Sequence, residues 1–287
     1  MNFHGEASLV DVHNHLVPGV DDGARDDAAV LASIQRMSAA GIRRIVTTPH
    51  IDASLTHDPR RLEERLGEVD RAFAEAAAAV EAAFPDVQFL RGHEVMIDVP
   101  EPELDDPRLR MNGTPFVLVE WPRLQVPPGT PRVIQWLRDQ KYVPIIAHEE
   151  RYAGVVETPG IMRRWKAAGA LLQVNYGSFV GRYGASAQQA AFAILEHGLA
   201  DYLASDFHGH AGLGIYRKEA WAALEARGSV EILETLCRTN PSRLIEGLGP
   251  LPVTPLPGAP GLLGRIRGMM KKSRDRRPAD SRTFPGE

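Results

Sequence analysis

The amino-acid sequence predicts an α/β protein in which seven parallel strands, followed by helices, close into a barrel. Short apolar runs alternate with helical patterns along the chain, which is typical of a parallel sheet covered by helices. Seven such strand patterns occur before residue 250. The alternative is an open doubly wound sheet, but no Gly-x-Gly-x-x-Gly turn follows the first strand. Ligands of a barrel of this kind bind at the C-terminal ends of the strands.

The predicted strands are short apolar runs bounded by turn residues or polar side chains. In chain order they cover residues 8–12, 43–49, 87–91, 116–119, 142–147, 170–174 and 200–204. The predicted helices cover residues 26–41, 59–84, 131–140, 160–168, 186–197, 217–225 and 230–238, and a last helical turn begins at residue 240. The first helix has two aspartates near its start, an apolar stripe on one face, and Gly41 as its C-terminal cap. The second is long and rich in alanine.

Composition excludes several classes of protein. The formal net charge of −4 gives no basis for binding nucleic acid. The single cysteine, Cys237, excludes an internal disulfide framework and a cysteine zinc cluster, and it indicates a reducing compartment. The N-terminus lacks the pattern of a signal peptide, and no apolar run approaches the ~20 residues that span a membrane. We therefore expect a soluble, cytoplasmic protein.

The composition changes near residue 250, so we predict one domain over residues 1–250 and a flexible tail over residues 251–287. Residues 252–262 are rich in proline and glycine, and residues 265–277 form a basic run. Such a run is typical of a solvated, disordered tail. The alternative is a weak amphipathic contact with an acidic membrane surface or with a partner.

Side chains that bind metals follow most of the predicted strands. His13 and His15 are two residues apart, so on an extended backbone they point to one face. Asp21 and Asp22 follow in a turn flanked by glycine. The other candidates stand at or just beyond the ends of later strands: His50, Glu94, Glu120, His148, Asp206 and His208. Without Asp21 this makes nine residues at one rim, and their mutual repulsion requires positive charge, which metal ions supply.

The ligand types restrict the metal. Imidazoles mixed with carboxylates, without cysteine, suit Mn²⁺, Fe or Zn²⁺ better than copper or an iron–sulfur cluster. Nine ligands are too many for one ion, so we expect two or three ions with bridging carboxylates. Clusters of this kind activate water near neutral pH and stabilise the oxygens of a transferring phosphoryl group.

Arg151 is the predicted phosphate-binding residue. It lies three residues after His148, and a guanidinium group matches phosphate geometry and stays charged. The alternative is a surface arginine paired with one of the two preceding glutamates. Asn175 and Ser178, in the loop after the sixth strand, are further candidates for contact with the substrate.

Residues 237–243 fit the cysteine-x5-arginine signature of thiol-dependent tyrosine phosphatases, and we interpret this match as a coincidence. That loop needs small residues and free backbone N–H groups around the phosphate. Here Cys237 occupies a core position in a helical pattern, and Pro241 removes one N–H group.

The motifs resemble the PHP-domain (polymerase and histidinol phosphatase) superfamily. Within it, they are most similar to the manganese-dependent bacterial protein tyrosine phosphatases of the CpsB type, which are encoded with capsule or exopolysaccharide genes. The matching segments are residues 11–15, 20–23, 47–50, 92–94, 119–120, 147–152, 173–175, 204–208 and 240–241. They cover most of the chain in order. The family fold is a distorted seven-stranded (β/α) barrel with its metal site at the C-terminal ends of the strands, which agrees with the strand count.

The resemblance also implies roles for individual residues. The first ion would be held by His13, His15, Glu94 and Asp206, and Glu94 would bridge to the second. The second ion would be completed by Glu120 and His148, and the third would be held by Asp22, His50 and His208. Arg151 would bind the phosphate and stabilise the transition state. Family members often carry another basic residue soon after the seventh strand, for which Arg217 and His210 are the candidates here.

We therefore predict a metal-dependent phosphatase, with Mn²⁺ as the expected metal, that hydrolyses phosphotyrosine on a protein. The expected partner is the phosphorylated tail of a membrane-associated tyrosine kinase that controls exopolysaccharide synthesis. One alternative is the same site acting on a small phosphomonoester such as histidinol phosphate. The other is a metal-stabilised binding module without turnover.

Overall fold

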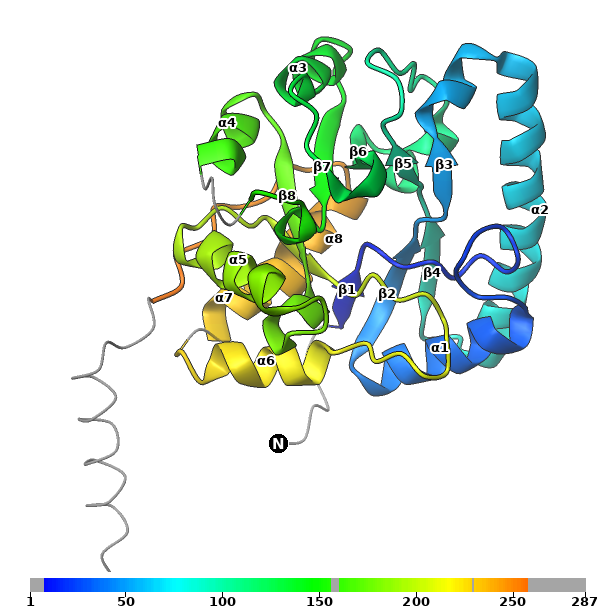
Figure 1. Ribbon diagram of the computed structural model, residues 1–287. Coiled ribbons are helices and arrows are strands. Elements are labelled where there is room, and N and C mark those ends of the chain that lie inside the picture. The colour runs from blue at the N-terminus through cyan, green and yellow to red at the C-terminus, as the bar shows by residue number, and fades with distance from the viewer. Residues whose placement is uncertain (1–7, 156–159, 229, 258–287) are drawn as a thin grey trace, which may run out of the picture. The chain divides into compact units, whose positions relative to one another are not determined.

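The computed structural model describes residues 8–155, 160–228 and 230–257, and each predicted strand and helix has a counterpart there. The strands are β1 (Leu9–Asp11), β2 (Ile42–Thr47), β3 (His50–Asp52), β4 (Gln88–Arg91), β5 (Glu94–Met96), β6 (Phe116–Glu120), β7 (Val143–Ala147), β8 (Leu171–Asn175) and β9 (Tyr202–Ala204). The helices are α1 (Asp27–Ala39), α2 (Pro59–Ala83), α3 (Thr130–Asp139), α4 (Gly160–Ala167), α5 (Ala185–Glu196), α6 (Arg217–Glu225), α7 (Val230–Glu234) and α8 (Asn240–Ile245). Figure 1 shows their arrangement.

The predicted closed barrel of seven strands is not confirmed. Over the described residues, nine parallel strands form two sheets, with the orders β1-β2-β4 and β3-β5-β6-β7-β8-β9. The count rises because two strands resume after a break: β3 follows β2 beyond Thr48 and Pro49, and β5 follows β4 beyond Gly92 and His93. Proline has no N–H group to donate to a ladder. The interrupted strands nevertheless stay side by side, since Glu94 N donates to the Pro49 carbonyl at 3.1 Å.

The third strand unit also lacks the α-helix that a repeating β/α pattern requires. Residues 97–115, between β5 and β6, contain two short 3-10 turns, Pro107–Leu109 and Met111–Gly113, and no α-helix. Pro100, Pro102 and Pro107 lie in this segment. Proline in a helix interior removes a hydrogen bond and clashes with the preceding turn, so three within eight residues prevent a regular helix.

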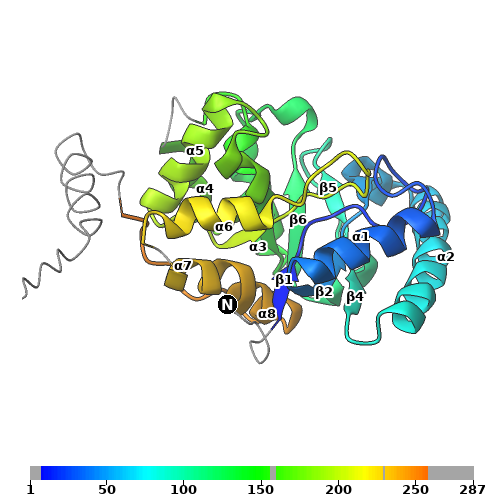
Figure 2. The same cartoon turned by 90° about the horizontal axis from the view of Figure 1, so that it is seen from below.

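The chain segments that follow β1 and β9 connect the two sheets by hydrogen bonds. Asn14 and Phe207 form an isolated parallel bridge, and Asp206 N donates to the His13 carbonyl at 2.8 Å. These contacts lie just past the C-terminal ends of the two strands, where the predicted ligands are. Seen from below, α8 lies beside β1 (Figure 2), and the two elements are in contact.

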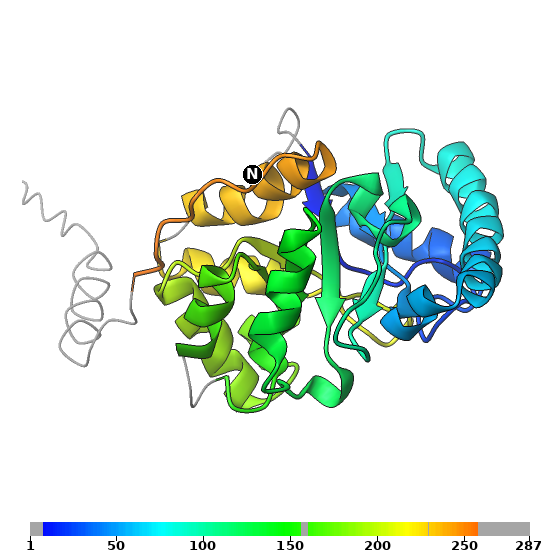
Figure 3. The same ribbon diagram turned by 90° about the horizontal axis from the view of Figure 1, so that it is seen from above.

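Strand residues alternate between two apolar clusters, so both faces of the sheets are buried. In β6, Phe116 and Leu118 belong to a small cluster that combines strands of both sheets with Leu244 of α8. Val117 and Val119 belong to a larger cluster that includes side chains of the outer helices. Figure 3 shows the strands and these helices from above. Polar side chains that continue the inner series therefore gather above the small cluster, at the C-terminal ends of the strands.

The structure describes the first residues of the predicted tail, 251–257, and they contact the preceding domain. Leu251 N donates to Asn240 Oδ1 at 2.8 Å, Leu256 N donates to the Leu195 carbonyl at 2.8 Å, and the Leu256 side chain is buried. The basic run at 265–277 lies outside the described residues, so its membrane or partner contact stays a prediction. Among the helices that the structure describes, none is long and apolar enough to cross a membrane.

Candidate metal centre

The chain after β1 presents two buried histidines side by side. The Nε2 atoms of His13 and His15 lie 3.4 Å apart. The following turn folds back on them because Gly23 has no side chain, and a Cβ there would lie 2.1 Å from the His15 carbonyl oxygen. This turn brings Asp21 Oδ2 to 2.9 Å from His15 Nδ1. A carboxylate at Nδ1 fixes the ring with Nε2 directed at the neighbouring side chains, as second-sphere carboxylates do for metal-binding histidines.

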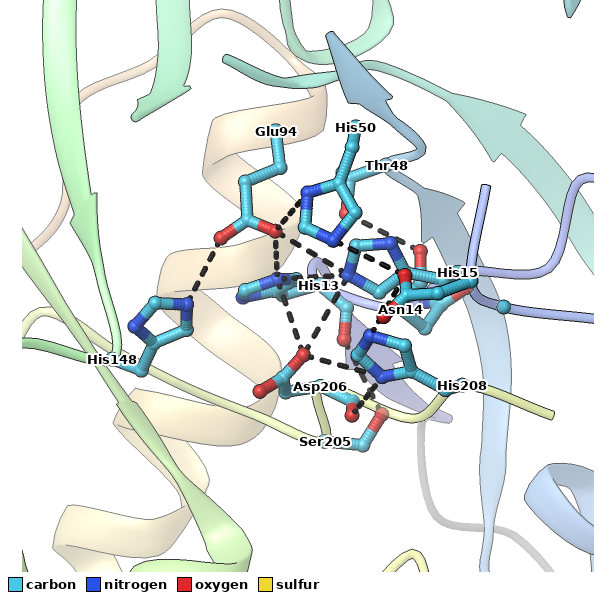
Figure 4. A network of polar contacts seen from close by, with 12 residues as sticks. His13, Asn14, His15, Thr48, His50, Glu94, His148, Ser205, Asp206 and His208 are labelled. Carbon is cyan, nitrogen blue, oxygen red and sulfur yellow. Dashed lines mark hydrogen bonds and ion pairs between the residues drawn. The ribbon is translucent and has the colours of Figure 1, made fainter. Parts of the chain in front are cut away.

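Glu94 contacts four of the predicted ligands, all of them histidines (Figure 4). Its Oε2 is 3.1 Å from His13 Nε2 and 3.4 Å from His15 Nε2. The same oxygen is 3.2 Å from His50 Nδ1, and Oε1 is 3.0 Å from His148 Nε2. The strand register explains part of this placement, because Glu94 pairs with His50 across β5 and β3. Within the described chain Oε2 is buried without a hydrogen-bond partner, so it is directed at a point where several lone pairs converge.

Asp206 approaches the same histidines from the chain after β9. Its Oδ1 is 3.5 Å from His13 Nε2 and 3.6 Å from His15 Nε2. The backbone of Asp206 adopts a left-handed conformation with φ of 50°, and His148 does the same with φ of 36°. Non-glycine residues rarely adopt this conformation, which costs energy and is concentrated at functional sites. Two candidate ligands are therefore held by unfavourable backbone geometry.

His50 connects the buried part of the cluster to its exposed edge. Its Nδ1 is 3.4 Å from Glu120 Oε1, and its Nε2 is 3.3 Å from Asp22 Oδ1. Asp22 Oδ1 is also 3.4 Å from His208 Nε2, and Glu120 Oε2 is 3.7 Å from His148 Nε2. Each of the nine residues predicted from the sequence therefore contacts another of the nine at 3.7 Å or less.

Three sets of these side chains have the spacing of a metal site, with one ligand atom from each residue within 4.8 Å of the others. The sets are His13, His15 and Glu94; His50, Glu94 and Glu120; and His15, Asp22, His50 and His208. Glu94 belongs to two sets, as expected of a bridging carboxylate. The sets differ from the assignment implied by the family resemblance. The first lacks Asp206, His50 takes the place of His148 in the second, and His15 joins the third.

A chain of buried hydrogen bonds along β8 links two of the candidate ligands. Asp206 Oδ2 is a carboxylate oxygen, so Asn175 Nδ2 donates to it, at 2.8 Å. Asn175 Oδ1 is then left to accept from Gln173 Nε2 at 2.9 Å, and Gln173 Oε1 accepts from His13 Nδ1 at 2.7 Å. With its proton on Nδ1, neutral His13 presents the Nε2 lone pair to Glu94 and Asp206, which is the tautomer that a metal ion requires.

The electrostatics of the cluster fit a bound cation. Burial lowers the pKa of His13, but Glu94 and Asp206 outweigh it and raise that pKa to about 9. Burial likewise lowers the pKa of His15, but hydrogen bonds to Asp206, Asp21 and Glu94 raise it well above its ordinary value. The two buried carboxylates thus demand positive charge at the point that both Nε2 atoms face. A divalent ion supplies it and displaces the protons.

Arg151 lies next to the cluster. Its Nη1 donates to Asp206 Oδ2 at 2.7 Å, and its guanidinium carbon is 4.3 Å from the centre of the Tyr183 ring. The alternative partner, Glu150, is buried and instead accepts from Ser178 Oγ at 2.5 Å and from the backbone N–H of Asn175 at 3.0 Å. Ser178 therefore supports the cluster indirectly, through its hydrogen bond to Glu150.

The two candidates for an additional basic residue are placed differently. Arg217 donates to the backbone carbonyl of Ala40, and its guanidinium carbon lies 5.1 Å from the Trp221 ring centre, so the structure does not bring it to the cluster. His210 lies near the exposed edge, with its Nε2 3.0 Å from the Asp22 carbonyl oxygen.

Several residues outside the nine predicted ligands shape the site. Asp21, beside the predicted ligand Asp22, contacts His15. Gln173 belongs to a matched motif, and its spacing from Asn175 repeats the two-residue spacing of the first histidine pair, which is the signal that could have identified it. Tyr183, which packs against Arg151, and Arg182, which packs against Tyr183, carry no comparable signal.

The cysteine signature does not contribute to the site. Cys237 is fully buried in a π-helical turn, Thr235–Thr239, between α7 and α8. Burial raises the pKa of its thiol to about 12, so the thiolate that such chemistry needs is not formed at neutral pH. This placement agrees with the interpretation of the motif as a coincidence.

The parallel α/β fold and the buried histidine–carboxylate cluster at its strand ends describe a protein equipped to bind metal ions. More specifically, the chain belongs to the capsular polysaccharide synthesis family CpsB/CapC, whose model matches residues 9–246. The family expected from the sequence motifs is thereby confirmed.

Curated relatives and solved structures agree with this membership. The tyrosine-protein phosphatase YwqE of Bacillus subtilis is 27% identical over 227 residues, which is 78% of this chain and 87% of the relative. The tyrosine-protein phosphatase CpsB of Streptococcus pneumoniae is 23% identical over 83% of this chain and 98% of the relative. A solved chain from the crystal structures of these two proteins, described as unique metal-dependent tyrosine phosphatases, aligns with a TM-score of 0.71 and 25% identity over 87% of this chain and 99% of its own length.

A more distant structure shows the fold alone. The phosphotriesterase homology protein of Escherichia coli, solved with phosphate in its active site, aligns with a TM-score of 0.51 at 11% identity. The alignment covers 83% of this chain and 98% of the other.

Proposed function

We propose that this protein is a metal-dependent phosphatase that hydrolyses phosphotyrosine on a protein. The observation that carries the proposal is the position of Arg151, whose guanidinium contacts Asp206 at 2.7 Å on the edge of a cluster of histidines and carboxylates. This arrangement places a planar cation, which hydrogen-bonds phosphate oxygens, beside side chains that can bind the metal ions of phosphoryl transfer. The names of the YwqE and CpsB relatives support the same activity.

We assign the metal ligands as the family resemblance implies. The first ion is held by His13, His15, Glu94 and Asp206, the second by Glu94, Glu120 and His148, and the third by Asp22, His50 and His208. The spacing of the three sets supports seven of these nine ligands and adds His50 to the second ion and His15 to the third. His148 and Asp206 are assigned from their contacts with Glu94 and His13, at 3.0 Å and 3.5 Å. Mn²⁺ is the proposed metal, with two or three ions per chain, and Fe or Zn²⁺ as alternatives. When bound, the ions supply an activated water and Lewis-acid stabilisation of phosphoryl oxygens.

Arg151 is the proposed catalytic residue. Among the described residues, the only hydrogen-bonded partner of its guanidinium group is Asp206, so most of its five N–H donors are available to phosphate oxygens. The Tyr183 ring against its face keeps the guanidinium plane in one orientation. A fixed, planar cation beside the reacting phosphorus stabilises charge as it develops in the transition state.

The chemistry of the leaving group favours a tyrosine substrate. The phenol of tyrosine has a pKa of about 10, far below that of an aliphatic alcohol. Its phenolate therefore leaves without a strong general acid. Burial raises the pKa values of Glu94 and Asp206, but their histidine neighbours outweigh it and hold both pKa values well below the ordinary range. Such carboxylates are poor proton donors.

We further propose the biological setting that the family suggests. The substrate is the phosphorylated tail of a membrane-associated tyrosine kinase that controls exopolysaccharide synthesis, and the reaction takes place in the cytoplasm. Residues 1–250 form the catalytic domain in this proposal, and residues 251–287 form the tail. Arg151, with Asn175 behind it, provides the first contacts to the substrate.

The proposal is tested by phosphate release from a phosphotyrosyl peptide and from histidinol phosphate, each with Mn²⁺ and with EDTA. Mn²⁺-dependent turnover of the peptide alone is the expected result. Turnover of histidinol phosphate alone would replace the protein substrate with a small phosphomonoester. Tight metal binding without turnover of either compound would indicate a binding module, and turnover that survives complete metal removal would refute the mechanism.

A further inference from the structure

A small pocket opens beside the exposed edge of the metal centre. Its volume is about 180 Å³, and its lining includes Asp206, His208 and Arg151. Tyr183, Tyr216 and Arg182 line it as well. The pocket therefore combines the candidate phosphate-binding residue with two aromatic rings and a second arginine.

The two tyrosines are held firmly in place. Tyr183 packs against the Arg151 guanidinium at 4.3 Å. Tyr216 has a left-handed backbone with φ of 58°, and its ring lies so close to Gly214 that a Cβ there would be 2.9 Å from Tyr216 Cε1. A tyrosine in this strained conformation is retained only when its surroundings fix it. The aromatic walls are thus preorganised, which reduces the entropy lost when a ligand binds.

Arg182 has a fixed stem and an exposed charge. Its backbone N–H donates to the Gly177 carbonyl at 3.0 Å, and a Cβ added to Gly177 would lie 3.1 Å from Arg182 Cβ. A larger residue at position 177 would therefore displace the arginine. In the part of the chain that the structure describes, no carboxylate forms an ion pair with Arg182. Its guanidinium lies 5.6 Å from the Tyr183 ring centre and is available to an anion outside the protein.

The volume of the pocket restricts its occupant. A cavity of about 150 Å³ in another protein accommodates benzene, so 180 Å³ admits one six-membered ring with little space left. A phosphate beside Arg151 and a ring against the tyrosines describe an aryl phosphate. A negative group beside Arg182 is the complement of its charge.

We propose that this pocket is the subsite for the ring of phosphotyrosine, and that Arg182 selects peptides with an aspartate or glutamate next to it. The inference rests on the proposed phosphatase function and specifies its substrate. Tyr183 and Tyr216 contact the ring through offset or edge-to-face packing, the arrangements that aromatic pairs prefer. Arg182 contacts the neighbouring carboxylate at the solvent-exposed rim, where an ion pair contributes modestly.

Charge selection is tested with phosphotyrosyl peptides that differ only in an aspartate, alanine or lysine next to the phosphotyrosine. We expect wild-type kcat/KM to favour the aspartate over the alanine peptide by about two- to fivefold, as exposed ion pairs allow. Arg182→Glu should reverse the order and favour lysine. Arg71→Glu, which makes the same charge change at an exposed position of α2, should keep the wild-type order. Equal kcat/KM values for all three peptides in wild type would refute the role of Arg182.

Ring selection is tested by binding, so that it does not depend on turnover. The Mn²⁺-loaded protein should bind phenylphosphonate about three- to tenfold more tightly than methylphosphonate, the range that an aromatic contact provides. Tyr216→Asn should abolish this difference, because asparagine tolerates the left-handed backbone but removes the ring. Aryl preference without peptide turnover would support the subsite and refute the phosphatase function. Peptide turnover without aryl preference would support the phosphatase and refute the subsite, and loss of both would refute both.

Discussion

Replacing Gln173 by leucine tests whether the hydrogen bonds along β8 hold the first metal site in shape. Gln173 accepts from His13 Nδ1 at 2.7 Å and donates to Asn175 Oδ1 at 2.9 Å. Leucine has a similar size and neither function, so both partners would remain buried without a hydrogen bond. Leaving one buried polar group unpaired costs about 1–3 kcal/mol. The cost is largest in the metal-bound protein, because the His13 proton must then stay on Nδ1 so that the Nε2 lone pair can bind the ion.

The expected effect appears in metal affinity as well as in stability. Loss of a partner behind a metal ligand lowers metal affinity by roughly 10- to 100-fold. We therefore expect Gln173→Leu to weaken Mn²⁺ binding by that factor in calorimetric titrations of the metal-stripped protein. The ¹⁵N shifts of the His13 ring should change from one tautomer to a mixture, a readout that is independent of activity.

Gln188→Leu is the matched control for this prediction. Gln188→Leu also removes an amide hydrogen bond, from Nε2 to the Phe179 carbonyl at 2.9 Å. Gln188 lies on α5, and among the described residues it forms no hydrogen bond with any of the nine candidate ligands. It should retain wild-type Mn²⁺ affinity. A folded Gln173→Leu protein that binds Mn²⁺ as tightly as wild type, with one His13 tautomer, would contradict the assignment of the hydrogen-bond chain.

Three further predictions follow from the same geometry. Arg151→Ala should lower kcat/KM for a phosphotyrosyl peptide by about 10²- to 10³-fold with metal content unchanged by elemental analysis; unchanged activity would remove Arg151 from the site. Cys237→Ser should retain full activity in the same assay, and the native thiol should resist iodoacetamide, because it is buried with a pKa raised to about 12. Metal affinity should fall as the pH falls from 9 to 7, by about tenfold per pH unit for each proton displaced. The reason is that the pKa of metal-free His13 is raised to about 9, so its proton must leave when the ion binds. Calorimetry in buffers of different ionisation enthalpy measures this proton release, and a pH-independent affinity would refute it.

The sequence predicted the elements well because their signals are local. Each predicted strand is a short apolar run and each predicted helix has an apolar stripe, and both patterns depend on neighbouring residues alone. The closed barrel could not be predicted in the same way, because closure depends on hydrogen bonds between β9 and β1, which are distant in the sequence. Those bonds form only past the strand ends, at Asn14 and Phe207. Pro49 has no N–H group to donate, so it interrupts one ladder of hydrogen bonds. Whether this interruption divides one strand into two depends on the neighbouring strand.

The alternation of side chains explains which parts of the site were accessible to sequence reasoning. Val46, Leu90 and Leu118 face the small inner cluster, and His50, Glu94 and Glu120 follow them by four, four and two residues. An even spacing keeps a side chain on the same face of a strand, and the interruptions after β2 and β4 preserve it. The ligands therefore converge although the strand count was wrong.

The ligands after β1 and β7 obey a different rule. Ala147 faces the inner cluster, so His148, one residue later, should face away from it. The left-handed backbone of His148, with φ of 36°, turns the chain and directs the side chain to Glu94. Likewise Val12 belongs to the inner cluster, and His13 follows it by one residue. Turn geometry of this kind is set by long-range contacts such as Asp206 N to the His13 carbonyl, so the composition of the site was predictable but its hydrogen-bonded support was not.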